Sequence, residues 1–183
     1  MTTPLRVLAI SGSLRAGSSN TALLRAAAAL APPDVEVAPY AGLAGLPAFN
    51  PDRDDDGDPA VTDLRARLRA ADGVLISTPE YAHGVPGALK NCLDWVVGSG
   101  ELVDKPIGII HASRSPWALS SLIETLTVMS ARVIADARIT VELASNRVDE
   151  AAIASDPGLA GPIRAAVAAL AAAIATRRAA PGE

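Results

Sequence analysis

Short apolar segments alternate with segments of helical pattern along the chain. Strands are predicted over residues 5–10, 35–40, 73–78, 106–113 and within 132–143. Helices are predicted over residues 19–31, 59–71, 86–98, 117–131 and 161–178, several of them with apolar side chains at helical spacing. Strand followed by helix, repeated, is typical of a parallel sheet with helices on both faces, and the continuously apolar strands agree with this.

The order of elements also predicts where a ligand binds. In open sheets of this class, ligands bind at the carboxyl ends of the strands, near the point where the strand order reverses. The loops after the first, third and fourth strands are therefore the candidate site loops.

Composition narrows the class of protein. The 183 residues are half apolar and one fifth charged (50% and 20%), and we expect residues 1–183 to form a single domain. A net charge of −4 without a run of Lys and Arg argues against nucleic acid as a partner. Without a signal-peptide pattern or an apolar run near the ~18 residues of a membrane span, we expect no membrane span and a cytoplasmic location.

The loop after the first strand, SGSLRAGSSN, has the composition of an anion site. It matches neither G-x-G-x-x-G nor G-x-x-x-x-G-K-[ST], which disfavours a dinucleotide site and a P-loop. It leads into a helix N-terminus, where free N–H groups favour negative charge. Further donors are available from Ser13, Arg15, Ser18, Ser19 and Asn20.

Local charge agrees with this interpretation. Residues 1–33 contain three arginines and no Asp or Glu, although the whole chain is acidic. A terminal phosphomonoester, which needs many donors from one loop, fits better than a pyrophosphate. An ordinary Gly/Ser turn with Ser18 or Ser19 as helix N-cap accounts for the stretch equally well.

The loop after the third strand reads STPEYAHGVPGALKNCLDW. Pro79 turns the chain out of the strand, and Gly84, Pro86 and Gly87 shape the entry into the next helix. Glu80, Tyr81 and His83 then lie at the edge of the predicted crevice. An aromatic ring with exposed peptide groups suits a flat heteroaromatic ligand; a well-formed loop with a packed tyrosine is the alternative.

Together, GSLRAGSSN and PEYAHGVPGALKNCLDW resemble the NADPH-dependent FMN reductase family, which includes quinone-, azo-dye- and chromate-reducing members. The resemblance also covers ADGVLISTPEY, the spacing of the two motifs and the fourth strand. It implies an α/β, flavodoxin-like fold: a doubly wound, five-stranded parallel sheet of order 2-1-3-4-5 with helices on both faces. It further implies that FMN is the cofactor and that NADPH or NADH is the co-substrate.

The resemblance also implies cofactor-binding residues. Around the FMN phosphate these are Ser13, Leu14, Arg15, Ser18, Ser19 and Asn20. Around the isoalloxazine ring, largely through backbone groups, they are Pro79, Glu80, Tyr81, Ala82 and His83. Many relatives carry Asn where this chain has Ala82, so only backbone contacts carry over there. Ser113 matches a flavin-contacting position, and Arg114, Ser115 and Trp117 would face the nicotinamide or acceptor pocket.

The function so implied is that of an FMN-dependent NAD(P)H oxidoreductase. Hydride passes from the nicotinamide to the flavin, and electrons then pass to a quinone, free flavin, azo compound or similar small molecule. No catalytic side chain is required, and a homodimer or homotetramer is expected. A flavodoxin-type electron carrier without its own NAD(P)H activity is the alternative from another class, and a related fold that binds no flavin is a third hypothesis.

Several other residues are expected to have structural roles and not to take part in the site. His111 is expected to be a packed core or interface histidine, and Cys92 an apolar core residue. The acidic run of residues 52–58 lacks the downstream Glu of an EF-hand loop and is expected to be a solvated loop. No metal site is predicted.

Overall fold

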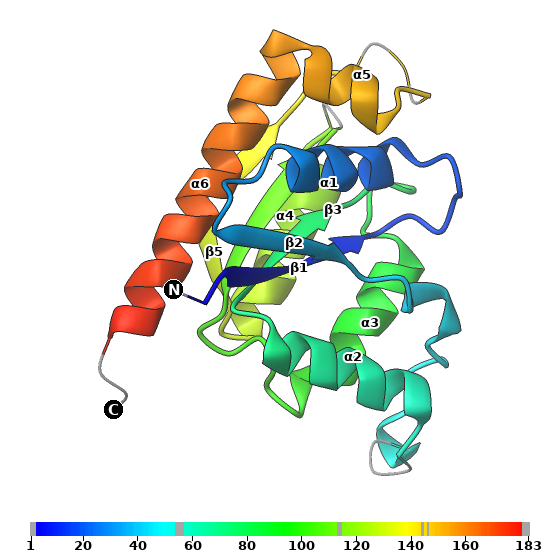
Figure 1. The fold of residues 1–183 in the computed structure, drawn as a ribbon. Coiled ribbons are helices and arrows are strands. Elements are labelled where there is room, and N and C mark those ends of the chain that lie inside the picture. The colour runs from blue at the N-terminus through cyan, green and yellow to red at the C-terminus, as the bar shows by residue number, and fades with distance from the viewer. Residues whose placement is uncertain (1–2, 54–56, 113–114, 144, 146, 181–183) are drawn as a thin grey trace.

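The computed structural model describes residues 3–53, 57–112, 115–143, 145 and 147–180. Its centre is an all-parallel five-stranded sheet in the order β2-β1-β3-β4-β5, which confirms the predicted topology (Figure 1). The strands are β1 (Leu5–Ser11), β2 (Val35–Pro39), β3 (Gly73–Ser77), β4 (Pro106–His111) and β5 (Arg132–Thr140).

The helices follow the predicted alternation, with one addition. They are α1 (Ser19–Ala29), α2 (Pro59–Ala70), α3 (Gly87–Val97), α4 (Trp117–Val128), α5 (Glu150–Ser155) and α6 (Pro157–Ala179). Two short 3-10 turns, η1 (Leu43–Gly45) and η2 (Pro51–Arg53), lie between β2 and α2.

The sequence prediction was wrong at the start of the last helix. It missed α5 and began the final helix at residue 161, whereas α6 begins at Pro157. Asp149 and Asp156 cap the two helices by accepting hydrogen bonds from first-turn N–H groups. Pro162 lies inside α6, where its missing N–H costs one helical hydrogen bond close to the helix start.

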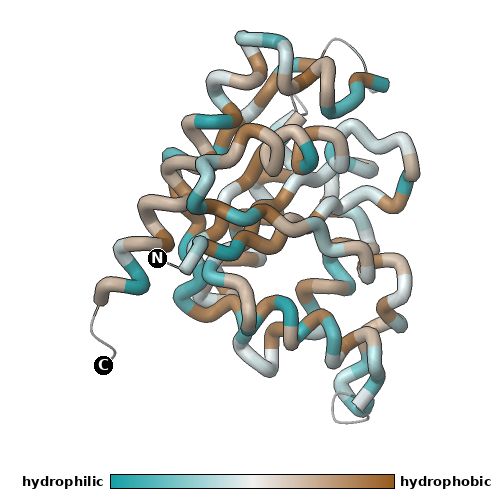
Figure 2. The backbone as a smooth tube through the Cα atoms, in the orientation of Figure 1, coloured by the Kyte–Doolittle hydropathy of each residue, from teal (hydrophilic) through white to brown (hydrophobic). Residues whose placement is uncertain are grey.

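The alternation of side chains along each strand divides the core into two layers. Leu8 and Ile10 of β1 pack with α2, α3 and α4, whereas Val7 and Ala9 pack with α1, α5 and α6. Figure 1 shows α1, α5 and α6 on one side of the sheet and α2 and α3 on the other, and Figure 2 shows apolar strand segments at the centre. Cys92 lies in the first layer, as predicted, and burial raises the pKa of its thiol to about 12.

Helix α6 is long and apolar enough, by length and composition alone, to cross a membrane. Its Ile163, Val167, Leu170 and Ile174 are buried in the layer formed with β1, β3 and β4. A core helix with one buried face passes the same test of length and composition. Packing against the sheet therefore accounts for the apolar side chains of α6.

The sheet brings the predicted site loops to one edge. Ser11 at the end of β1 is registered with Ser77 at the end of β3, and the Gly12 N–H donates to the Ser77 carbonyl at 2.8 Å. His111 ends β4 next to β3. The loops after β1, β3 and β4 consequently start side by side, at the point where the strand order reverses.

Candidate functional site

The loop between β1 and α1 is held tightly against the end of β3. A Cβ atom on Gly12 would lie 2.4 Å from Thr78 Oγ1, so only glycine permits this approach. Ser13 is buried, and its Oγ accepts a hydrogen bond from the Arg15 N–H at 3.3 Å. Leu14 and Arg15 are exposed on the loop. The loop therefore has a fixed base and an exposed, cationic tip.

The start of α1 is left without a side-chain cap. Ser18 occupies the N-cap position but makes no capping hydrogen bond through its hydroxyl, which argues against a plain N-cap role there. Helices α2, α5 and α6, in contrast, are each capped by an Asp carboxylate. First-turn N–H groups without an acidic neighbour, next to hydroxyls and a guanidinium, are a donor set that fits a phosphate.

Asn20 connects this helix start to the neighbouring strand. Its Oδ1 accepts a hydrogen bond from Ser77 Oγ at 3.0 Å, and both residues are buried. Ser11 Oγ and Thr21 Oγ1 form a second link at 2.8 Å between β1 and α1. Sequence reasoning missed the roles of Ser11, Thr21 and Ser77, although hydroxyl residues at strand ends next to a predicted anion loop were a usable signal.

The loop after β3 contains a tight two-residue turn. Tyr81 and Gly84 exchange backbone hydrogen bonds, with N–H to O distances of 3.1 and 2.9 Å. Between them, Ala82 and His83 have φ angles of 48° and 61°. Two consecutive residues with positive φ are the pattern of a type I′ turn, which favours Asn and Gly. Ala82 is therefore in a strained conformation where an Asn or Gly would not be.

We expect Ala82→Gly to raise the free energy of unfolding by about 0.5–1 kcal/mol, because glycine removes the left-handed penalty but adds unfolded-state entropy. Ala66→Gly is the matched control, since Ala66 is exposed within α2 and glycine there should cost about 1 kcal/mol. Urea denaturation measures both changes. A loss of stability in Ala82→Gly would contradict the assignment of strain to this turn.

The Glu80 carboxylate joins this loop to the start of α4. Its oxygens accept hydrogen bonds from Ser115 Oγ at 2.5 Å and from the Ala118 N–H at 2.9 Å. These two hydrogen bonds, the Ala118 one first, lower the pKa of Glu80 below its usual range. The sequence predicted Glu80 as a backbone neighbour of the flavin and missed this role of its side chain.

Two exposed aromatic side chains lie on these loops. Tyr81 is 52% exposed and Trp117, the first residue of α4, is 57% exposed. The His83 and Trp117 rings are stacked, with centroids 5.7 Å apart and an interplanar angle of 24°.

The predicted residues Ser113 and Arg114 lie outside the described residues, as do Asp54, Asp55 and Asp56 of the acidic run.

His111 is buried, as predicted, at the end of β4. Its Nε2 lies 3.2 Å from the Ser115 carbonyl oxygen, so the imidazole also supports the β4–α4 connection. Within the described part of the chain, no three His, Cys, Asp or Glu side chains gather as a metal site.

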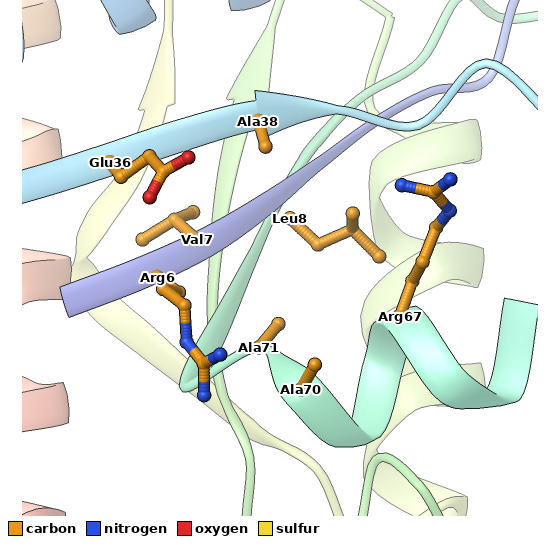
Figure 3. Close-up of a pocket in the computed structure, with 8 residues that line it drawn as sticks. All are labelled: Arg6, Val7, Leu8, Glu36, Ala38, Arg67, Ala70 and Ala71. Carbon is orange, nitrogen blue, oxygen red and sulfur yellow. The ribbon is translucent and has the colours of Figure 1, made fainter.

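A hollow of about 140 Å³ lies away from these loops, between α2 and the strands β1 and β2 (Figure 3). It is lined by Arg6, Val7, Leu8, Glu36, Ala38, Arg67, Ala70 and Ala71. None of these residues belongs to the predicted site. Arg67 is already bound to Asp63, with Nε to carboxylate distances of 2.8 and 3.0 Å. The hollow is therefore separate from the candidate site.

Comparison with known proteins shows the family of this chain. Residues 5–145 match the NADPH-dependent FMN reductase family. An NAD(P)H-dependent FMN reductase of Pseudomonas aeruginosa is 35% identical over 81% of this chain and 84% of its own length. A quinone reductase of Escherichia coli is 35% identical over 70% of this chain and 74% of its own.

The fold of this chain is similar to that of a solved flavoenzyme structure. The flavoenzyme NAD(P)H:(acceptor) oxidoreductase of Paracoccus denitrificans superimposes with a TM-score of 0.75 and 25% identity, over 94% of this chain and 98% of that one. Fold and sequence together define a flavodoxin-like oxidoreductase that uses FMN and NAD(P)H. The chain belongs to the NADPH-dependent FMN reductase family.

Proposed function

We propose that this oxidoreductase passes electrons from NAD(P)H through FMN to a quinone. The observation that carries the cofactor site is the uncapped start of α1, beside a loop whose exposed Arg15 has no carboxylate partner among the residues that the structure describes. The quinone is supported by the Escherichia coli relative, which is named a quinone reductase.

The proposed cofactor contacts are those that the family resemblance implies, and the adjacent placement of the loops after β1 and β3 supports them. The phosphate is held by first-turn N–H groups of α1 together with Ser13, Leu14, Arg15, Ser18, Ser19 and Asn20. The ring is bordered by backbone groups of Pro79, Glu80, Tyr81, Ala82 and His83, and by Ser113. The hydrogen bonds from Ser115 and Ala118 to the Glu80 carboxylate fix the β3–α3 loop relative to α4. They thereby orient the backbone groups that border the ring.

The chemistry that bound FMN would supply is two-electron transfer from the nicotinamide to the acceptor. The chain's own contribution is to bind and orient, so we assign no catalytic acid or base to any side chain. Arg15 and the α1 N–H groups neutralise the phosphate charge. Gly12 brings the phosphate loop against the ring-bordering loop, so that one ligand spans both.

Two measurements on the purified protein test this proposal. FMN titration should quench flavin fluorescence, and the loaded protein should oxidise NADPH or NADH when a quinone is added. A panel that includes free flavin and an azo dye then ranks the acceptors. A protein that neither quenches FMN fluorescence nor acquires a flavin spectrum would contradict the cofactor site.

A flavodoxin-type electron carrier is the second candidate function, and the shared fold is what favours it. A carrier would bind FMN but consume almost no NAD(P)H by itself. Stopped-flow mixing of the FMN-loaded protein with NADPH separates the two functions, because only the oxidoreductase bleaches the flavin without a partner enzyme.

We also propose a single cytoplasmic FMN-binding domain that forms a homodimer or homotetramer. The resemblance to the family supports association. Three valines are more than half exposed and would gain from burial against another subunit: Val97 at the end of α3, Val103 before β4 and Val128 at the end of α4. Light scattering that gives the mass of a monomer at micromolar concentration would contradict the oligomer.

A further inference from the structure

The Trp117 ring is held in an exposed position at the edge of the candidate site. It is 57% exposed, and the His83 ring stacks on it at a centroid distance of 5.7 Å. Trp117 belongs to α4 and His83 to the β3–α3 loop. The stack therefore joins the β3–α3 loop to the helix that follows the β4 loop.

The segment that carries Trp117 is also anchored to the β3–α3 loop. The Ser115 hydroxyl, two residues before Trp117, and the Ala118 N–H, directly after it, both donate hydrogen bonds to the Glu80 carboxylate. His83 lies in the tight turn closed by Tyr81 and Gly84. Both ring partners are thus anchored before any ligand binds, which reduces the entropy lost when a ligand packs on the indole.

The other tryptophan of the chain, Trp95, has a purely structural role and serves as a comparison. Trp95 is 2% exposed, donates its Nε1–H to the Pro47 carbonyl at 2.8 Å and packs edge-on against Phe49. Trp117 instead keeps more than half of its surface in water, although it is rigidly held. Exposed aromatic surface beside other exposed aromatic groups is typical of binding sites.

Rigidity and exposure indicate stacking of a flat ligand. His83 lies against Trp117, and Tyr81 is exposed on the same loop as His83. Offset stacking on an indole favours planar aromatic rings over ligands of other shapes. The proposed flavin ring lies on the loop that carries Tyr81 and His83, so a ring stacked on Trp117 would be next to it.

We propose that Trp117 is the acceptor-specificity residue of this enzyme, on which a planar aromatic acceptor such as a quinone ring stacks. The proposal rests on the proposed function, because it assigns a substrate subsite to the same FMN site. His83 acts as a positioning residue that fixes the indole plane.

The test compares a planar acceptor with one that cannot stack. The kcat/KM for 2-methyl-1,4-naphthoquinone and for ferricyanide is measured with the FMN-loaded protein at saturating NADPH. In Trp117→Leu, the ratio of the quinone value to the ferricyanide value should fall about three- to tenfold, chiefly through KM for the quinone. Trp117→Phe, which keeps an aromatic face, should recover most of the ratio.

Glu124→Ala is the control, because Glu124 is exposed on the same helix, away from its first turn. It should leave the ratio unchanged. An equal loss for both acceptors in Trp117→Leu, or no change in either, would overturn the assignment of Trp117. FMN fluorescence quenching distinguishes this failure from that of the proposed function, since wild-type protein that binds no FMN or reduces neither acceptor contradicts both proposals.

Discussion

Gly12→Ala is expected to lower the free energy of unfolding by about 1–3 kcal/mol and to weaken FMN binding at least about tenfold. The added Cβ would lie 2.4 Å from Thr78 Oγ1, 2.9 Å from Thr78 Cβ and 3.1 Å from Leu89 Cδ2. Thr78 and Leu89 are fully buried, and the Thr78 hydroxyl donates to the Pro79 carbonyl, so neither side chain can move cheaply. The β1–α1 loop must move instead.

Gly17→Ala is the control in the same loop. A Cβ atom on Gly17 would have no neighbour within 4 Å, and the residue is exposed with φ outside the left-handed region. The free energy of unfolding of Gly17→Ala should differ from that of the wild type by less than about 0.5 kcal/mol. Urea denaturation and FMN titration of the two variants give the comparison. Equal stabilities would show that the Gly12 contact is not constraining the loop.

The strands were predictable from the sequence because a parallel sheet covered on both faces requires apolar strands, and their order was predicted from the resemblance to the FMN reductase family. Residues 73–77, for example, are apolar except at the end and are buried throughout. The rule that ligands bind at the carboxyl ends then selected the loops after β1, β3 and β4 before any geometry was known. The structure does place those loops side by side, through Gly12 and Ser77.

Contacts between residues far apart in sequence were not predictable. The Glu80 carboxylate binds the start of α4, 38 residues away for Ala118, and nothing in the PEY motif specifies that partner. Lys105 is another example: lysine side chains are almost always exposed, but this one is buried, and its Nζ donates to the Leu68 and Ala71 carbonyls at the end of α2. Burial lowers the pKa of Lys105 to about 8.

Local backbone strain was also hidden from the sequence. The residues of the motif suggested backbone contacts at Ala82, but not that Ala82 and His83 both have positive φ. Alanine has no preference for that conformation, so the turn is imposed by its surroundings, namely the paired Tyr81 and Gly84. The same turn directs His83 onto Trp117, which makes the exposed stack a consequence of tertiary structure.

Arg15→Ala is expected to raise the Kd for FMN about tenfold to a hundredfold and to leave the Kd for riboflavin almost unchanged. Riboflavin has the same ring but lacks the phosphate, so the difference isolates the phosphate contact. Arg15 is exposed at the tip of a loop whose base is fixed by Gly12 and Ser13, so its removal should not disturb the fold. Fluorescence quenching by each ligand gives the two constants.

Arg25→Ala provides the matched charge control, because Arg25 lies on α1 and pairs with Glu150 at 3.5 Å on the surface. The substitution removes one positive charge from the helix whose start is proposed to bind the phosphate. The exposed, screened pair that it breaks contributes little to the free energy of unfolding. FMN affinity should therefore stay within about threefold of the wild-type value, since long-range charge alone is weak at physiological salt. Equal losses of FMN and riboflavin affinity in Arg15→Ala would show that Arg15 contacts the ring or stabilises the fold. Phosphate binding would then depend on the α1 N–H groups and the serine hydroxyls alone.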